Sequence, residues 1–524
     1  IMAHSSFLSV MMWALTSILL VANIIVGTPN CVKREFPAGT VCVCNATHCD
    51  DIEQLDDFIA PGMAILYQTD INGARMDKSA LKQTSNPVHL TIEMDPSIPF
   101  QNIIGFGGAI TDAVGVNLAA LSHEAQNKLM KQYYGPSGSE YTLTRVPMAA
   151  TDFSLRIYTY DDNQDGDDFN MTYFALANDD YQYKIPYLKQ AMELQKDIGG
   201  LKLFAAPWTP PIWMKNDPIF KGGALLKGEQ NGPYYSSYAK YFVKFFEAYL
   251  AEGLPFWAVS LQNEPSDWQT IFPTATYQSN FIKNHLAPAL KSSAASKNLK
   301  IMGLEDQRVY LPEWMDEFAT DQDALTLLDG ISVHWYADHS KPASVLSQVH
   351  EKYPEKFILY TEACNGSPTS GTAGPSLGNF TSGESYAHSI IEDLNNWVGG
   401  WVDWNIALNT QGGYSWFMNF VDSPIIVETN LNEFFKQPMY YVIAHFSKFL
   451  KPGAQVVKLN LPQLPEKVEA VGAVMVNGNR YVTILNRNDN EDIIVSLHEK
   501  GVGSVYTTVS VPAHSLVTVI WTKY

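Results

Sequence analysis

Basic residues are scarce in this chain of 524 residues. It contains 35 Lys and Arg against 54 Asp and Glu, which gives a formal net charge of −19. Because so acidic a chain repels phosphate groups, the composition argues against a nucleic-acid partner. Charged residues make up only 17% of the sequence and hydrophobic residues 46%, a balance typical of a chain with a large core rather than a disordered one.

Cysteine is also rare, with five residues in the whole chain. Four of them, Cys31, Cys42, Cys44 and Cys49, lie in one short segment, whereas Cys364 has no obvious partner. In an exported protein this spacing is typical of two disulfides in a small N-terminal sheet. A zinc knuckle is the alternative for the same four residues.

Long hydrophobic runs are limited to one, at residues 7–27 (FLSVMMWALTSILLVANIIVG), which contains no Asp, Glu, Lys or Arg. Its length and position favour a cleaved signal peptide over residues 1–27, with an uncleaved membrane anchor as the alternative. A signal peptide predicts the secretory pathway, where the sequons at Asn45, Asn170 and Asn379 are candidate N-glycosylation sites.

Short apolar runs alternate with segments of helical periodicity from about residue 103. The runs are IIGFGGAITD, TLTRVPMAATDF, LKLFAAPWTPP, FWAVSLQNEP, KIMGLED, GISVHWYAD, FILYTEAC and GWVDWNIALN. Strands that alternate with helices in this way predict an α/β fold, a (β/α)8 TIM barrel over residues 103–453. The chemistry of such barrels sits at the C-terminal ends of the strands.

The segments on either side of this barrel have a sequence pattern typical of β-strands. Residues 454–524 hold short β-branched runs separated by Asn, Gly or Pro, and residues 57–102 hold similar ones. We therefore predict one all-β sandwich built from 57–102 together with 454–524. Residues 28–56 remain for the small disulfide-bearing sheet.

Two glutamates lie at the ends of predicted barrel strands, Glu264 after the fourth and Glu362 at the seventh. Across a barrel mouth two such carboxylates can lie about 5 Å apart, the separation of a retaining glycosidase, whereas a wider gap would indicate inversion. An ionised nucleophile makes ionisation of its neighbour costly, so the neighbour stays protonated as the acid. We assign Glu264 as the acid/base and Glu362 as the nucleophile.

Aromatic residues, which sugar sites need as platforms, gather at the predicted strand ends. They are Trp208, Trp213, Trp335, Tyr336 and Trp404, and each could equally belong to the core. Arg145 and Asp152 flank the end of the second strand, where a structural ion pair is the alternative role for Arg145. His334 has no second ligand at metal-binding spacing, so we expect a hydrogen-bonded residue of the site wall.

Many ordered sequence blocks point to one family. They are VCVCNATHCD, GFGGAITDA, RVPMAATDFSLRIYTYDD, APWTPPIW, NEPS, HWY, TEAC and GWVDWNIALN with WFMNFVDSPII. From about Cys31 to its C-terminus the chain resembles the lysosomal glucosylceramidases of glycoside hydrolase family 30. The resemblance implies the same three-part architecture after a signal peptide. It also implies a retaining β-glucosidase that hydrolyses glucosylceramide to glucose and ceramide through a covalent glucosyl-enzyme, in sphingolipid metabolism.

The resemblance also assigns roles to single residues. It implies Glu264 as acid/base and Glu362 as nucleophile, the latter supported by Arg145 and Tyr336, with Phe420 as a wall of the pocket. The residues implied to contact glucose hydroxyls are Asp152, Trp208, Asn263, Trp404 and Asn419. No metal or organic cofactor is implied. The implied setting is the lysosome, or alternatively secretion, with a saposin-type activator and anionic lipid as partners at a membrane surface.

Two departures from the family pattern concern the rim of the predicted site. Residues 267–278 form a shorter loop that lacks the family's cysteine, and Thr151 replaces another cysteine beside Asp152. The departures leave the residues of the predicted sugar pocket unchanged and concern the part of the rim that would meet the aglycone. One alternative is a related glycosidase acting on β-1,6-glucan, xylan or a steryl glucoside. A non-catalytic glycolipid-binding protein is another, although it would not need a paired acid and nucleophile.

Overall fold

The computed structural model describes residues 30–56, 58–88, 90–162, 166–221, 225–266, 271–367 and 373–523. The predicted signal peptide, residues 1–27, lies outside these ranges, as do residues 267–270 of the loop that follows Glu264. Within them, every helix is too short or too polar to cross a bilayer.

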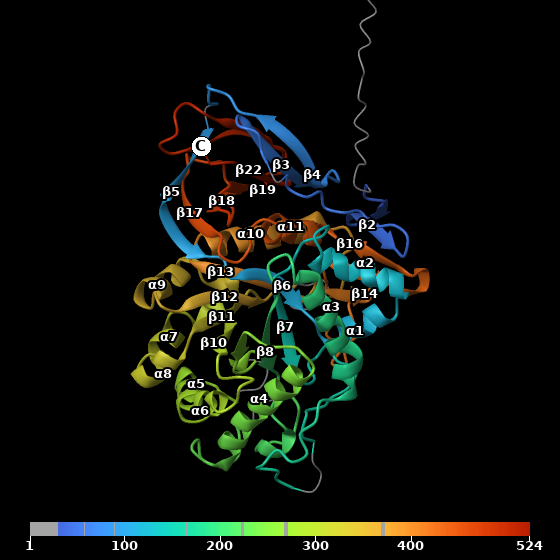
Figure 1. Cartoon of the computed structure of the whole chain (residues 1–524), viewed down its shortest axis with the longest axis vertical. Coiled ribbons are helices and arrows are strands. Elements are labelled where there is room, and N and C mark those ends of the chain that lie inside the picture. Colours follow the sequence, from blue (N-terminus) through green and yellow to red (C-terminus); the bar gives the residue numbers. More distant parts are fainter. Residues whose placement is uncertain are drawn as a thin grey trace, which may run out of the picture.

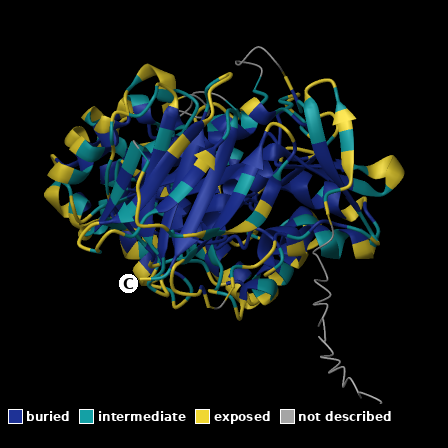
Figure 2. Cartoon of the chain, turned by 90° about the horizontal axis from the view of Figure 1, so that it is seen from above, coloured by how far each residue is buried: buried dark blue, intermediate teal, exposed yellow. Residues whose placement is uncertain are grey.

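Eight parallel strands close into a barrel in the order β10-β11-β12-β13-β6-β7-β8-β9. They are β6 (Gly105–Ala109), β7 (Leu143–Met148), β8 (Lys202–Pro207), β9 (Ala258–Ser260), β10 (Lys300–Gln307), β11 (Gly330–His334), β12 (Phe357–Glu362) and β13 (Val398–Asn405). Each strand coincides with one of the predicted apolar runs, so the (β/α)8 barrel is confirmed. The strands are largely buried and the outer faces of the surrounding helices are exposed (Figure 2).

Helices follow the strands and surround the barrel (Figure 1). They are α1 (Asp112–Ala119), α2 (His123–Tyr134), α3 (Ile185–Gln195), α4 (Pro233–Ala251), α5 (Ala275–Phe281), α6 (Ala287–Lys291), α7 (Glu313–Phe318), α8 (Gln322–Leu327), α9 (Ser344–Lys352), α10 (Phe380–Leu394) and α11 (Pro438–Ser447). Side-chain caps fix several starts: Thr111, Ser122 and Asp321 each accept a hydrogen bond from the backbone N–H three residues on. Helices α10 and α11 lie between the barrel and the second β-structure (Figure 1).

The second β-structure joins both ends of the chain in the order β21-β20-β5-β17-β18-β19-β22-β3-β4. Its strands are β3 (Met63–Asp70), β4 (Arg75–Lys82), β5 (Leu90–Asn102), β17 (Gln455–Asn460), β18 (Val468–Val474), β19 (Arg480–Asn486), β20 (Ile493–Glu499), β21 (Thr507–Val511) and β22 (Ser515–Trp521). The backbones of Thr84 and Tyr506 exchange hydrogen bonds of 2.8 Å, which bring the two ends of this order together. The fold is thus a TIM barrel with a separate β-sandwich, as the sequence predicts.

A smaller sheet has the order β1-β2-β16-β15-β14. Its strands are β1 (Lys33–Phe36), β2 (Gly39–Asn45), β14 (Ala407–Asn409), β15 (Ile425–Glu428) and β16 (Glu433–Lys436). Disulfides join Cys31 to Cys42 and Cys44 to Cys49, which confirms two disulfides and excludes the zinc knuckle. The sheet differs from the prediction in one respect, because three of its strands come from the chain segment assigned to the barrel. Cys44 on β2 pairs with Phe434 on β16, so a strand from the chain segment assigned to the barrel extends the disulfide-bearing sheet.

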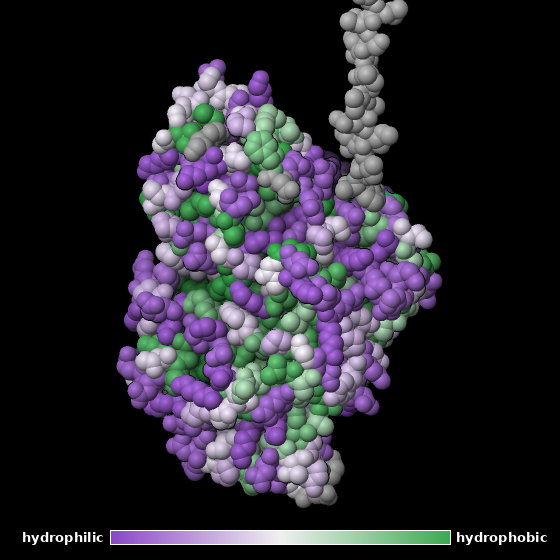
Figure 3. All heavy atoms as spheres, in the orientation of Figure 1, coloured by the Kyte–Doolittle hydropathy of each residue, from purple (hydrophilic) through white to green (hydrophobic). Residues whose placement is uncertain are grey.

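The surface is mostly polar. The face in Figure 3 is covered mostly by hydrophilic residues, with smaller hydrophobic areas between them. Of the sequon asparagines, Asn170 is exposed, and Asn45 and Asn379 are half-buried. N-glycosylation at these three positions stays a prediction.

Candidate active site

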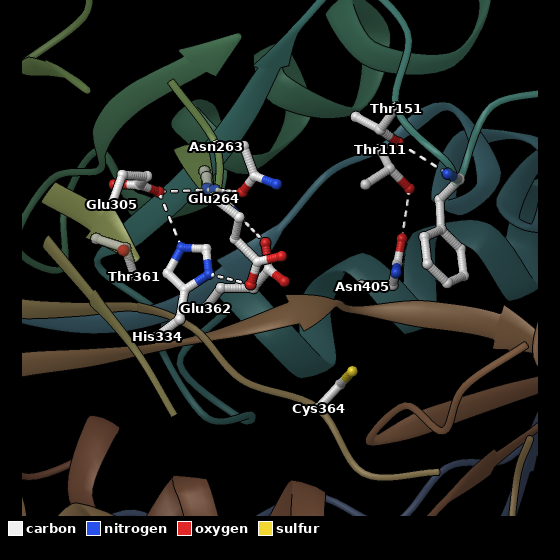
Figure 4. Close-up of polar contacts among 12 residues, drawn as sticks. Thr111, Thr151, Asn263, Glu264, Glu305, His334, Thr361, Glu362, Cys364 and Asn405 are labelled. Carbon is white, nitrogen blue, oxygen red and sulfur yellow. Dashed lines mark hydrogen bonds and ion pairs between the residues drawn. The ribbon is translucent and has the colours of Figure 1, made fainter. Parts of the chain in front are cut away.

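Glu264 and Glu362 meet at the C-terminal end of the barrel. Glu362 is the last residue of β12, and Glu264 follows β9 on the connecting loop. One carboxylate oxygen of each lies within 4.8 Å of the other (Figure 4). The backbone of Glu264 is left-handed, with φ of 40°, and its N–H donates to the carbonyl of Glu305 at 3.0 Å. The two carboxylates thus have the close spacing of a retaining pair rather than the wide spacing of an inverting one.

Glu362 is held by hydrogen bonds to both of its oxygens. The guanidinium of Arg145 on β7 donates to Oε2, and the Tyr336 hydroxyl donates to Oε1 at 2.8 Å. Arg145 is fully buried and also donates to Oδ1 of Asn263 at 2.7 Å. Hydrogen bonds to both oxygens fix the carboxylate of Glu362 in orientation.

Glu264 is held on one oxygen by two donors. Gln307 at the end of β10 donates from Nε2 to Oε1 at 2.8 Å, and Nδ1 of His334 lies 2.9 Å from the same oxygen. Burial alone would lower the pKa of His334, but the charge of Glu362 and hydrogen bonds to Glu264 and Glu305 raise the pKa to about 10. His334 is therefore an imidazolium that donates from both ring nitrogens.

Two tryptophans form a stacked pair above the buried arginine. The rings of Trp208 and Trp404 lie 5.1 Å apart at an interplanar angle of 16°. The guanidinium of Arg145 lies 4.8 Å from the first ring centroid and 5.1 Å from the second. Because each cation–π contact holds the ring against a fixed charge, the pair presents a rigid aromatic wall.

A cavity of about 510 Å³ opens above these groups. The predicted residues that line it are Asp152, Trp208, Asn263, Glu264, Tyr336, Glu362, Trp404 and Asn419. Asn419 donates to Oδ2 of Asp152 at 2.7 Å. Burial, together with the charges of Glu362 and Glu264, raises the pKa of Asp152 to about 7. Carboxyl, amide and aromatic groups around one small cavity match what a sugar ring requires.

Phe420, predicted as a wall of the pocket, does not line the cavity. Its ring packs against Gly413, where an added Cβ would lie 3.1 Å from it, and Phe417 of the same loop lines the cavity instead. Trp213 and Trp335 are also outside the cavity. Trp213 packs edge-on against Phe169, and Trp335 packs edge-on against Trp401. Both tryptophans therefore have the packing role that was the alternative to a sugar platform.

Three residues that the sequence analysis did not single out belong to the site. Glu305 accepts from Arg145 at 2.6 Å, Asp306 accepts from the N–H of Ser266 at 2.9 Å, and Gln307 contacts Glu264. The three follow one another at the end of β10. Consecutive acid and amide residues after an apolar run were the available signal, because strand ends carry the chemistry of a barrel.

Three side chains of the site lie close enough together to share a metal ion. Glu264, His334 and Glu362 each offer one atom to a common point, all within 4.8 Å of one another. However, the raised pKa of His334 leaves both ring nitrogens protonated at neutral pH, so a metal would have to displace that proton. His334 is hydrogen-bonded, as expected from the sequence, but it is fully buried behind the cavity lining rather than part of the wall, and two carboxylates lie within metal-ligand reach that its sequence spacing did not indicate.

The chain is similar to known proteins in both sequence and fold. Residues 103–450 match the TIM-barrel domain of glycosyl hydrolase family 30. A putative glucosylceramidase 4 of Caenorhabditis elegans is 44% identical over 94% of this chain and 94% of its own length. The lysosomal acid glucosylceramidase of Mus musculus is 38% identical over 95% of this chain and 96% of its own. The crystal structure of SrfJ from Salmonella typhimurium covers 88% of this chain and 100% of its own at 24% identity, with a TM-score of 0.80, a likeness of fold.

Proposed function

Because this chain belongs to glycosyl hydrolase family 30 and is a glycoside hydrolase, we propose that it is a retaining exo-β-glucosidase that cleaves glucosylceramide. The observation that carries the mechanism is the pair Glu264 and Glu362, with carboxylate oxygens within 4.8 Å at the floor of one cavity. The substrate is inferred from the relatives, which are named as glucosylceramidases.

In the first step of the proposed mechanism Glu362 attacks the anomeric carbon. The new bond joins a Glu362 oxygen to that carbon while the glycosidic C–O bond breaks, and Glu264 gives its proton to the leaving oxygen. Arg145 and Tyr336 hold Glu362 for in-line attack through their hydrogen bonds. Both donors stay in place throughout the step, so the charge moves without a large rearrangement of the site.

In the second step Glu264, now ionised, takes a proton from water, and the water oxygen attacks the anomeric carbon to release Glu362. Asp152, Asn263 and Asn419 line the cavity and would bind glucose hydroxyls, and Trp208 and Trp404 would form the wall for the apolar face of the ring. These roles follow from the position and chemistry of each side chain.

We further propose that the protein works in the secretory pathway, in the lysosome or after secretion. Two disulfides close to the N-terminus favour an oxidising compartment for folding. The mouse relative is described as lysosomal and acid. A saposin-type activator and anionic lipid are proposed partners for presenting a lipid substrate to the cavity.

The test is hydrolysis of glucosylceramide in vesicles by the purified chain, with and without anionic lipid, against a β-1,6-linked glucose oligosaccharide. We expect release of ceramide and glucose, and NMR should detect β-glucose as the first anomer formed. Early α-glucose would contradict retention. Turnover of the oligosaccharide alone would assign the chain to a β-glucanase, and binding without any product would assign it to a lipid-binding protein.

A further inference from the structure

Glu305 is a third carboxylate of the site, buried behind the two that face the cavity. Its side chain is 1% exposed and is not part of the cavity lining. Oε1 accepts from Arg145 at 2.6 Å. The same oxygen lies 3.3 Å from Nε2 of His334, a contact drawn in Figure 4. Oε2 has no hydrogen-bond partner among the described residues. Burying an ionised carboxylate with one oxygen that lacks a hydrogen bond costs free energy, which indicates that Glu305 has a functional role at this position.

The backbone around Glu305 is strained in a way that aims this side chain. Leu304 and Glu305 are consecutive left-handed residues, with φ of 69° and 54°. The pairing of β10 with β11 slips between Leu304 and Asp306, which marks a bulge at the same place. Bulges and left-handed residues other than glycine are retained where they re-aim a side chain. Here the result is that Glu305 points between Arg145 and His334.

The buried charges of the site add up to zero only when Glu305 is counted. Arg145 and His334 carry two positive charges, and Glu305 and Glu362 carry two negative ones while Glu264 is protonated. After the first proposed step Glu362 is an ester and Glu264 has lost its proton, so Glu305 and Glu264 are the two negative groups. The sum is again zero. Without Glu305 the site would carry one excess positive charge in both states.

We propose that Glu305 is a positioning residue that keeps the buried site electrically neutral in both steps and thereby sets the pH range in which the enzyme is active. The inference rests on the proposed function, since it concerns the roles of Glu264 and Glu362. In support, Arg145 and His334 outweigh the effect of burial and lower the pKa of Glu305 to about 2, so its charge is permanent at any working pH.

Two other carboxyls lie near Glu264 and do not serve the same purpose. Burial and the charge of Glu264 raise the pKa of Asp306 to about 6, and the pKa of Asp152 rises to about 7. Both therefore hold protons through much of the acidic range. Of the carboxyls facing His334, which are Glu264, Glu305 and Glu362, only Glu305 takes no part in bond making or proton transfer.

The test is the pH dependence of kcat/KM for an aryl β-glucoside in wild type and Glu305→Gln. Removing a negative charge makes neighbouring carboxyls lose their protons at lower pH. We expect both limbs of the bell-shaped profile to move to lower pH by about one unit or more. Glu305→Asp keeps the charge and should keep the limbs in place. Thr144→Val, which removes a buried hydroxyl that contacts Tyr134 without changing charge, is the matched control.

A double variant tests whether the shift comes from the lost charge. Glu305→Gln combined with His334→Gln removes one charge of each sign, so its limbs should lie closer to the wild-type positions than those of Glu305→Gln alone. Unmoved limbs in Glu305→Gln, limbs that move as far in Glu305→Asp, or a double variant shifted as far as Glu305→Gln would overturn the inference. A wild type that fails to hydrolyse β-glucosides would instead overturn the proposed function.

Discussion

Gln307 donates from Nε2 to Oε1 of Glu264 at 2.8 Å. The same side chain accepts at Oε1 from the backbone N–H of Ala337 at 3.2 Å. Ala337 is next in sequence to Tyr336, which donates to Glu362. One amide at the end of β10 therefore joins the segment that holds the proposed nucleophile to the proposed acid/base.

Replacing Gln307 by Leu should weaken proton donation by Glu264. We expect kcat/KM for glucosylceramide to fall by about 10- to 100-fold, within the usual contribution of a positioned general acid. An activated aryl glucoside needs little protonation of its leaving group and should lose less. Gln322→Leu on the outer surface at α8 is the control. Equal losses on both substrates would contradict a role for Gln307 in positioning the acid.

Tyr336→Phe removes one of the two donors to Glu362 and leaves Arg145 in place. Because the lost bond steadies the nucleophile, kcat should fall by about tenfold or more, and by similar factors for good and poor leaving groups. Tyr353→Phe, whose hydroxyl contacts Asp316 on the outer surface, should behave as wild type. A Tyr336→Phe loss confined to poor leaving groups would mean that the hydroxyl serves the acid instead.

The folded protein should be more stable at pH 5 than at pH 8. Burial raises the pKa of Asp152 to about 7 and of Asp306 and Asp422 to about 6, from an ordinary 3.8. The folded state then holds more protons than the unfolded state between about pH 4 and 7, so stability falls as pH rises through that window. The pKa of His334 is raised from 6.5 to about 10, so this residue adds a further loss of stability as the pH rises above 6.5. His445 opposes the trend below 6.5, because burial lowers its pKa to about 3.

Thermal unfolding at both pH values measures this difference. Asp422 lies away from the cavity, where it accepts from the backbone N–H groups of Ser376 and Ser423. Asp422→Asn should reduce the gap between the two melting temperatures, because it removes one of the titrating groups. A wild type that melts at a higher temperature at pH 8 than at pH 5 would refute the assignment of these raised pKa values.

The disulfides should stabilise the small sheet by restricting the unfolded chain. They close loops with sequence separations of 11 and 5 residues. Loops of this size correspond to about 2–3 kcal/mol each in the chain-entropy account, slightly more for Cys31–Cys42. Reductant should therefore lower the melting temperature of wild type. A variant with Ser at all four positions should start lower and show no response to reductant, and an equal response in both would contradict the prediction.

The barrel could be predicted from the sequence because its strands are buried on both faces and read as continuous apolar runs. The small sheet could not be predicted fully, since β14, β15 and β16 are only three or four residues long and carry no measurable periodicity. They are strands because of long-range pairings that local sequence does not contain: β16 pairs with β2, and β15 and β14 extend the sheet beyond β16.

The same limit applies within the site. Glu362 ends β12 and Glu264 follows β9, so their meeting could be expected from topology alone. Glu305 lies in a bulge, where the alternation of side chains along β10 breaks, and its direction depends on two left-handed residues. Phe417 and Phe420 belong to one irregular loop, so only the fold of that loop decides which ring reaches the cavity.

Retention in the proposed mechanism requires that Glu362 form a covalent bond to the sugar. The direct test is to treat the protein with a 2-deoxy-2-fluoro-β-glucoside that has a reactive leaving group and to map the labelled peptide by mass spectrometry. We predict one glucosyl adduct on Glu362, and none in Glu362→Gln. An adduct on Glu264 or elsewhere, or inhibition without any covalent adduct, would contradict the central claim.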